Sequence, residues 1–87
     1  MEKEITISDV WIASFITAVV GIQPTLKIQN QLVVFCFPEN KKVAEAIKLF
    51  QMDYPVPVYS YVRAYKNLKA SMINLKILSE GKGNEKV

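Results

Sequence analysis

Histidine is absent from this sequence of 87 residues, and cysteine occurs only once. Histidine is the commonest general base and metal ligand, so its absence excludes Ser-His and Cys-His nucleophiles. The lone Cys36 stands between Phe35 and Phe37, in an apolar setting with no neighbouring base. Structural zinc needs about four Cys or His ligands, which this chain cannot supply. We therefore predict no metal site.

Glycine is scarce as well, and the acidic residues form no pair suited to acid–base catalysis. The three glycines, Gly21, Gly81 and Gly83, have the wrong spacing for a phosphate-binding loop or a dinucleotide fingerprint. Helix starts, exposed faces and chain ends account for nearly all carboxylates, and a turn accounts for Asp53. The sequence therefore predicts a protein that is not an enzyme and binds no cofactor.

Long apolar runs are lacking too. The most apolar stretch, Val10–Val20, is too short to span a bilayer, and the N-terminal residues MEKEITIS contain no apolar signal-peptide core. A single cysteine suits a reducing compartment. We expect a soluble, cytoplasmic protein without membrane association.

Charge is nearly balanced, with 11 Lys and Arg against 8 Asp and Glu. The hydrophobic fraction of 51% is typical of a globular protein and slightly higher than a small monomer needs. The length predicts one globular domain, residues 1–78. The polar segment 79–87 is predicted to be a disordered tail.

Residues 8–21 carry the strongest structural signal. Ser8 is a suitable N-cap, Asp9 complements the positive end of the helix dipole, and Gly21 suits a left-handed C-terminal position. The predicted helix has one face of large side chains, including Trp11, and one of small ones, including Ala13 and Thr17. Because neither face is charged, we expect both to be covered, the small one by the third helix or by a second subunit.

Three strands are predicted at residues 4–7, 25–29 and 32–37. A two-residue turn at Asn30-Gln31 places Leu26 and Ile28 on the same face as Val33, Phe35 and Phe37, whereas a three-residue turn places them with Leu32, Val34 and Cys36. Both registers leave apolar residues on the opposite face. Residues 32–37 should therefore form the central strand, buried on both sides.

Two further helices follow. Residues 39–51 are amphipathic, and a third helix is predicted from residue 57 or 58 to Leu78, although residues 58–62 also suit a strand. The fold class is therefore α+β: a small β-α-β-β-α-α domain with a three-stranded, mostly antiparallel sheet packed by three helices.

Several of these features occur together in one known family. They are the Ser8-Asp9 helix start, Gly21, the apolar segment Phe35–Phe37 and the later Tyr65–Lys69 segment. Over roughly residues 4–75 the chain resembles a family of short uncharacterised prokaryotic and phage-associated proteins, grouped as a domain of unknown function. Thr17-Ala18 departs from that family's larger aliphatic residues. The resemblance implies the architecture and a phage-associated, prokaryotic origin, but no activity.

Two functional hypotheses follow from the surface residues. Excess apolar surface predicts a non-catalytic interaction or assembly protein acting as a homodimer, or binding another protein, through Trp11, Ala13, Thr17, Val34, Ile73 and Ile77. The alternative is a nucleic-acid-binding accessory protein that uses the cations of the third helix, Arg63, Lys66, Lys69 and Lys76. No small-molecule substrate is indicated by the sequence.

Overall fold

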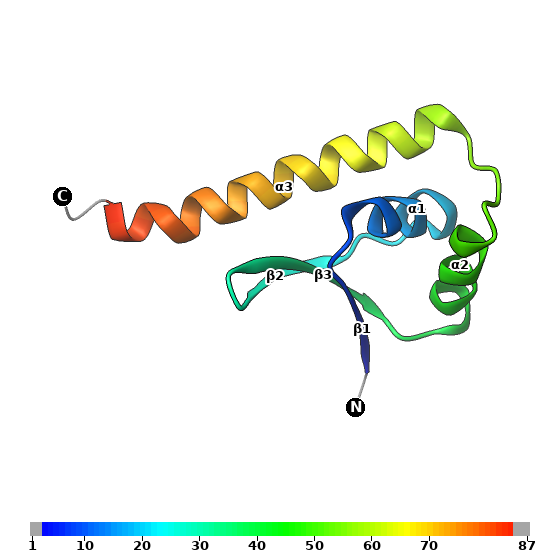
Figure 1. Ribbon diagram of the computed structural model, residues 1–87, viewed down its shortest axis with the longest axis horizontal. Coiled ribbons are helices and arrows are strands. Elements are labelled where there is room, and N and C mark those ends of the chain that lie inside the picture. The colour runs from blue at the N-terminus through cyan, green and yellow to red at the C-terminus, as the bar shows by residue number, and fades with distance from the viewer. Residues whose placement is uncertain (1–2, 85–87) are drawn as a thin grey trace.

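The computed structural model describes residues 3–84, with side chains described for residues 3–79. The elements follow in the order β1 (Glu4–Ile7), α1 (Val10–Val20), β2 (Thr25–Gln29), β3 (Leu32–Pro38), α2 (Lys41–Gln51) and α3 (Val58–Asn84). This order and the antiparallel sheet confirm the predicted α+β fold. Figure 1 shows α3 lying along α1, with α1 between α3 and the sheet and α2 at one end.

The strand order is β1-β3-β2, so β3 is central as predicted. Gln29 pairs with Leu32, which leaves a two-residue turn at Asn30 and Gln31 with left-handed φ values of 52° and 68°. Two positive φ values match the right-handed twist of the adjoining strands. The first of the two predicted registers is therefore confirmed: Leu26 and Ile28 share a face with Val33, Phe35 and Phe37.

Burial of β3 on both faces is also confirmed, but different elements cover the two faces. Phe35 and Phe37 belong to the core beneath the helices and are fully buried. On the opposite face, Cys36 is 3% exposed although Figure 1 places the helices on the other side of the sheet. The cover there comes from the edge strands, whose Lys27 and Glu4 form an ion pair of 3.3 Å across β3.

Helix α1 starts and ends where specific backbone groups are satisfied. The N-cap is Asp9 rather than the predicted Ser8, because its carboxylate accepts a hydrogen bond of 2.8 Å from the Trp11 N–H. At the other end Gly21 adopts φ 83° and donates its N–H to the Thr17 carbonyl at 2.9 Å. The small residues Ala13, Ser14 and Thr17 are buried within one chain, and α1 packs against α3. The expected cover of the larger face is incomplete, because Trp11 and Val19 remain 49% and 39% exposed.

Helix α3 is continuous from Val58, so residues 58–62 are helical and the strand alternative is wrong. The helix continues to Asn84, beyond the predicted end at Leu78. Residues 79–84 are therefore helical where a disordered tail was expected, and residues 85–87 lie outside the described residues. The molecule measures 48 × 34 × 18 Å, and Figure 1 shows the C-terminal part of α3 projecting past the other elements.

Candidate functional site

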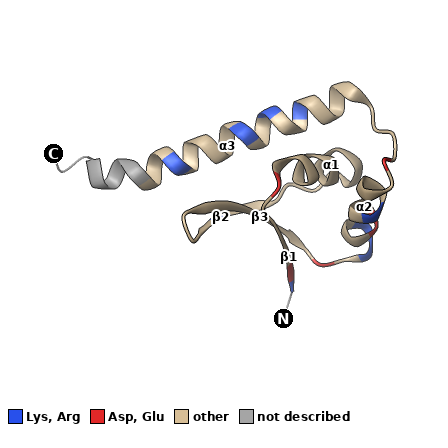
Figure 2. Ribbon diagram, viewed as in Figure 1, with Lys and Arg blue, Asp and Glu red and all other residues tan. Residues whose placement is uncertain are grey.

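The net positive charge of the described side chains lies on α3. Outside this helix, the lysines Lys3, Lys27, Lys41, Lys42 and Lys48 are balanced by the carboxylates Glu4, Asp9, Glu39, Glu45 and Asp53. Between Val58 and Ser79, all charged side chains of α3 are cations: Arg63, Lys66, Lys69 and Lys76. Figure 2 shows this contrast between α3 and the rest of the fold. The helix is therefore the surface to which an acidic partner would be drawn.

An aromatic cluster joins the start of α1 to α3. The rings of Trp11 and Tyr65 are stacked, with centroids 4.3 Å apart and planes at 3°. The Lys69 ammonium lies 5.5 Å from the Tyr65 centroid and donates to its hydroxyl at 3.1 Å. Trp11 remains 49% exposed despite these contacts. A half-exposed tryptophan, stacked on a tyrosine that contacts a cation, is typical of binding surfaces.

Tyr61 connects this cluster to the backbone of α1. Its hydroxyl donates a hydrogen bond of 3.1 Å to the Trp11 carbonyl. Burial raises the pKa of Tyr61 above its ordinary value of 10.0, and the negative charge of Asp9 raises it further. The phenol therefore stays protonated, and available as a donor to Trp11, throughout the physiological pH range.

Next to the cluster, α3 presents a row of exposed side chains that we call the α3 flank. Its members recur at steps of three and four residues, which places them on one side of a helix. They are Tyr59, Val62, Lys66, Lys69, Ile73, Lys76 and Ile77. Val62, Ile73 and Ile77 are 40%, 45% and 58% exposed. The flank therefore combines lysines with unburied aliphatic side chains.

The predicted interface residues divide into two groups. Trp11, Ile73 and Ile77 are exposed and lie on or beside the α3 flank. Ala13, Thr17 and Val34 are 0%, 8% and 6% exposed, so their assignment to a surface is wrong. Thr17 lies against α3, Ala13 belongs to the buried core, and Val34 lies in the central strand β3. The missed members, Tyr59 and Val62, follow the same three-and-four spacing, which the sequence already showed.

The predicted nucleic-acid contacts also divide. Lys66, Lys69 and Lys76 share the α3 flank, whereas Arg63 lies on another side of the helix, in a groove with Thr17 and Asn67. No single side of α3 therefore presents all four cations. The lysines form one group and Arg63 belongs to a different surface.

The described residues 3–79 contain no group of three potential metal ligands, and Cys36 is buried. Of the helices that the structure describes, none combines the length and the apolar character needed to cross a membrane. No protein-family model, curated protein or solved structure matches the chain. The family resemblance therefore stays a prediction.

Proposed function

We propose that this is a small non-catalytic interaction protein of the cytoplasm that forms a homodimer through the α3 flank. The observation that carries the proposal is the exposure of Val62, Ile73 and Ile77 on one side of a helix that projects from the fold. Exposed apolar side chains grouped on one surface usually mark an interface. The neighbouring Trp11 supplies the kind of aromatic anchor that contributes most to interface energy.

A second copy fits this surface because the spacing of the flank is symmetric. From Tyr59 to Lys76 its steps are three, four, three, four and three residues, which read the same in both directions. Antiparallel pairing about a two-fold axis therefore places Val62 opposite Ile73 of the second copy. Such an isologous contact buries the same aliphatic pair twice and closes without forming a filament.

The lysines give the dimer a characteristic response to salt. In the same pairing Lys66 lies opposite Lys69 of the second copy, so like charges meet at the centre. Their aliphatic stems can pack along the helices while the ammonium groups extend into water. Added salt screens the remaining repulsion. Dimerisation should therefore strengthen as the salt concentration rises.

Replacing Ile73 with lysine should weaken dimerisation about 100-fold, because the two-fold interface contains the change twice and about 1.4 kcal/mol per copy is a factor of ten. Sedimentation equilibrium over the micromolar range measures the association constant at low and high salt. Asn74→Lys is the matched control, since it adds the same charge one residue further along α3 but outside the flank. A wild-type chain that stays monomeric, or an equal effect of both variants, would contradict the proposal.

A second candidate is a nucleic-acid-binding accessory protein, and the concentration of net positive charge on α3 favours it. Lysines bind phosphates by releasing counterions, and exposed aromatic rings such as Trp11 stack on unpaired bases. Lys69 and Trp11 both contact Tyr65, so a cation and a stacking ring lie close together. This arrangement suits a single strand better than a duplex.

Fluorescence anisotropy with a labelled single-stranded oligonucleotide tests this candidate. Binding should be detectable at ~50 mM salt and fall steeply as salt is added, opposite to the trend expected for the dimer. The double variant Lys66→Glu/Lys69→Glu should abolish it. The control Lys41→Glu/Lys42→Glu makes the same charge change on exposed positions of α2 and should bind more tightly than the α3 variant. Absence of wild-type binding at ~50 mM salt excludes the candidate.

A further inference from the structure

A polar groove of about 370 Å³ lies between α1 and α3, on a different side of α3 from most of the flank. Helix α3 contributes side chains from successive turns, α1 contributes Thr17, and the segment after Gly21 contributes Gln23. The lining residues are Thr17, Gln23, Tyr59, Ser60, Arg63, Ala64 and Asn67. We call this the α1–α3 groove. Its volume falls in the range of small-ligand sites.

The lining is rich in hydrogen-bond donors and contains no carboxylate. Arg63 supplies the only cation of the lining, and it forms no ion pair with any described side chain. The amides of Gln23 and Asn67 and the hydroxyl of Ser60 add neutral donors. An acceptor-rich anion would satisfy such a set, whereas a cation would find no charged partner.

A second observation comes from Thr17, on the α1 side of the groove. The residue is 8% exposed, and its Oγ1 has no hydrogen-bond partner in the described part of the chain. The nearby Ser14 shows the usual solution in a helix, with its hydroxyl donating to the Val10 carbonyl at 2.6 Å. A buried hydroxyl without a partner is destabilising, so a rotation of the Thr17 side chain that turned Oγ1 toward a polar ligand in the groove would relieve this cost.

We propose that the α1–α3 groove binds a small phosphate monoester, with the phosphate held by Arg63. A guanidinium donates in a fork that matches phosphate oxygens, and a phosphoryl group has more acceptor oxygens than a carboxylate to use the surrounding donors. The groove leaves room for the organic part of the ester, and Tyr59 at its rim offers an aromatic face to a ring. This site shares Tyr59 with the α3 flank but uses none of its lysines.

Titration of the full-length chain with ribose 5-phosphate, followed by backbone NMR shifts, tests the proposal. Saturable shifts at Thr17, Gln23 and Asn67 with a dissociation constant of ~1 mM or tighter are expected. Ribose, which lacks the phosphate, should produce none, and inorganic phosphate should bind more weakly than the ester. The absence of saturable shifts, or equal affinity for inorganic phosphate, would overturn the assignment.

Three variants, one of them a control, locate the site within the protein. Arg63→Gln should weaken binding at least ~10-fold, because it removes a charge-assisted hydrogen bond. Lys41→Gln removes the same charge at an exposed position of α2, outside both the groove and the flank, and should leave the affinity unchanged. Equal losses in both of these variants would show attraction to net charge alone and would overturn the proposal.

Thr17→Val should fold, since it only exchanges a hydroxyl for a methyl group, and should weaken binding by ~3-fold or more. Unchanged affinity in this variant would also count against the proposal.

Discussion

Replacing Phe35 with alanine is expected to lower the free energy of unfolding by about 3–5 kcal/mol. Phe35 is 0% exposed at the centre of β3, where it pairs with Ile7 on one edge strand and Leu26 on the other. The same ring belongs to the core formed with α1, α2 and α3. Its removal therefore leaves a cavity that touches every layer of the fold, and local collapse cannot fill it.

Such a loss is large for a chain of this size. Domains are stable by about 0.05–0.15 kcal/mol per residue, or roughly 4–13 kcal/mol for 87 residues, so the variant should lose a large fraction of the stability. Urea denaturation followed by circular dichroism measures the change. Leu32→Ala is the control in the same strand, because Leu32 is 62% exposed and its loss should cost little. A Phe35→Ala variant within about 1 kcal/mol of wild type would contradict the described core.

Replacing Leu68 with alanine is expected to cost about 2–5 kcal/mol and to loosen α3 in particular. Leu68 is 3% exposed and is the member of α3 that belongs to the buried core. Ala64, one turn earlier, is also buried but is too small to hold the helix by itself. Loss of the Leu68 side chain therefore removes the main apolar attachment of α3 to the rest of the fold.

Hydrogen exchange distinguishes this effect from general destabilisation. Amides of α3 should lose more protection than amides of β3, because the helix detaches before the sheet unfolds. Leu78→Ala is the matched control: it makes the same change in the same helix at a side chain that is 70% exposed. Equal loss of protection in α3 and β3 would show that the helix and the sheet unfold together, contrary to this expectation.

The proposed functions depend to different extents on the attachment of α3. The Trp11–Tyr65 stack and the α1–α3 groove exist only while this helix lies against α1. The α3 flank, in contrast, belongs to one helix and needs no neighbour to form. Leu68→Ala should therefore impair ligand binding in the groove more than self-association through the flank.

The sequence predicted only part of the site. The spacing of Ile73, Ile77 and the lysines along α3 was visible, because helical position follows directly from residue number. The separation of Arg63 from those lysines follows the same rule. The burial of Ala13 and Thr17 was not predictable, because a small apolar face can be covered by another helix of the chain or by a partner with the same chemistry.

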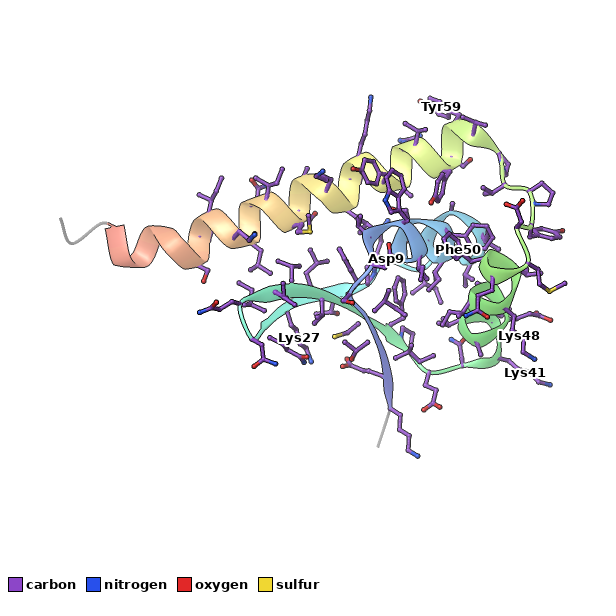
Figure 3. The ribbon with its side chains drawn as sticks, in the orientation of Figure 1. Asp9, Lys27, Lys41, Lys48, Phe50 and Tyr59 are labelled. Atoms are coloured by element: carbon purple, nitrogen blue, oxygen red, sulfur yellow. The ribbon has the colours of Figure 1, made fainter. Side chains whose placement is uncertain are left out.

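The α1–α3 groove was not foreseen at all. Thr17, Gln23 and Arg63 are distant along the chain, and each is unremarkable in its own segment. They come together because Gly21 ends α1 in a left-handed conformation and α3 then returns along that helix. Figure 3 shows side chains of α1 and α2, Phe50 among them, beneath α3.

The sequence by itself determined the α+β class, the element order and the central, doubly buried β3. These follow from local rules: the alternation of apolar residues, the glycine and proline stops, and the uncharged faces of α1. The tertiary structure alone decided the hairpin register, the partner of the small α1 face and the path of α3. Those choices depend on long-range packing between surfaces of similar chemistry, which no short stretch of sequence specifies.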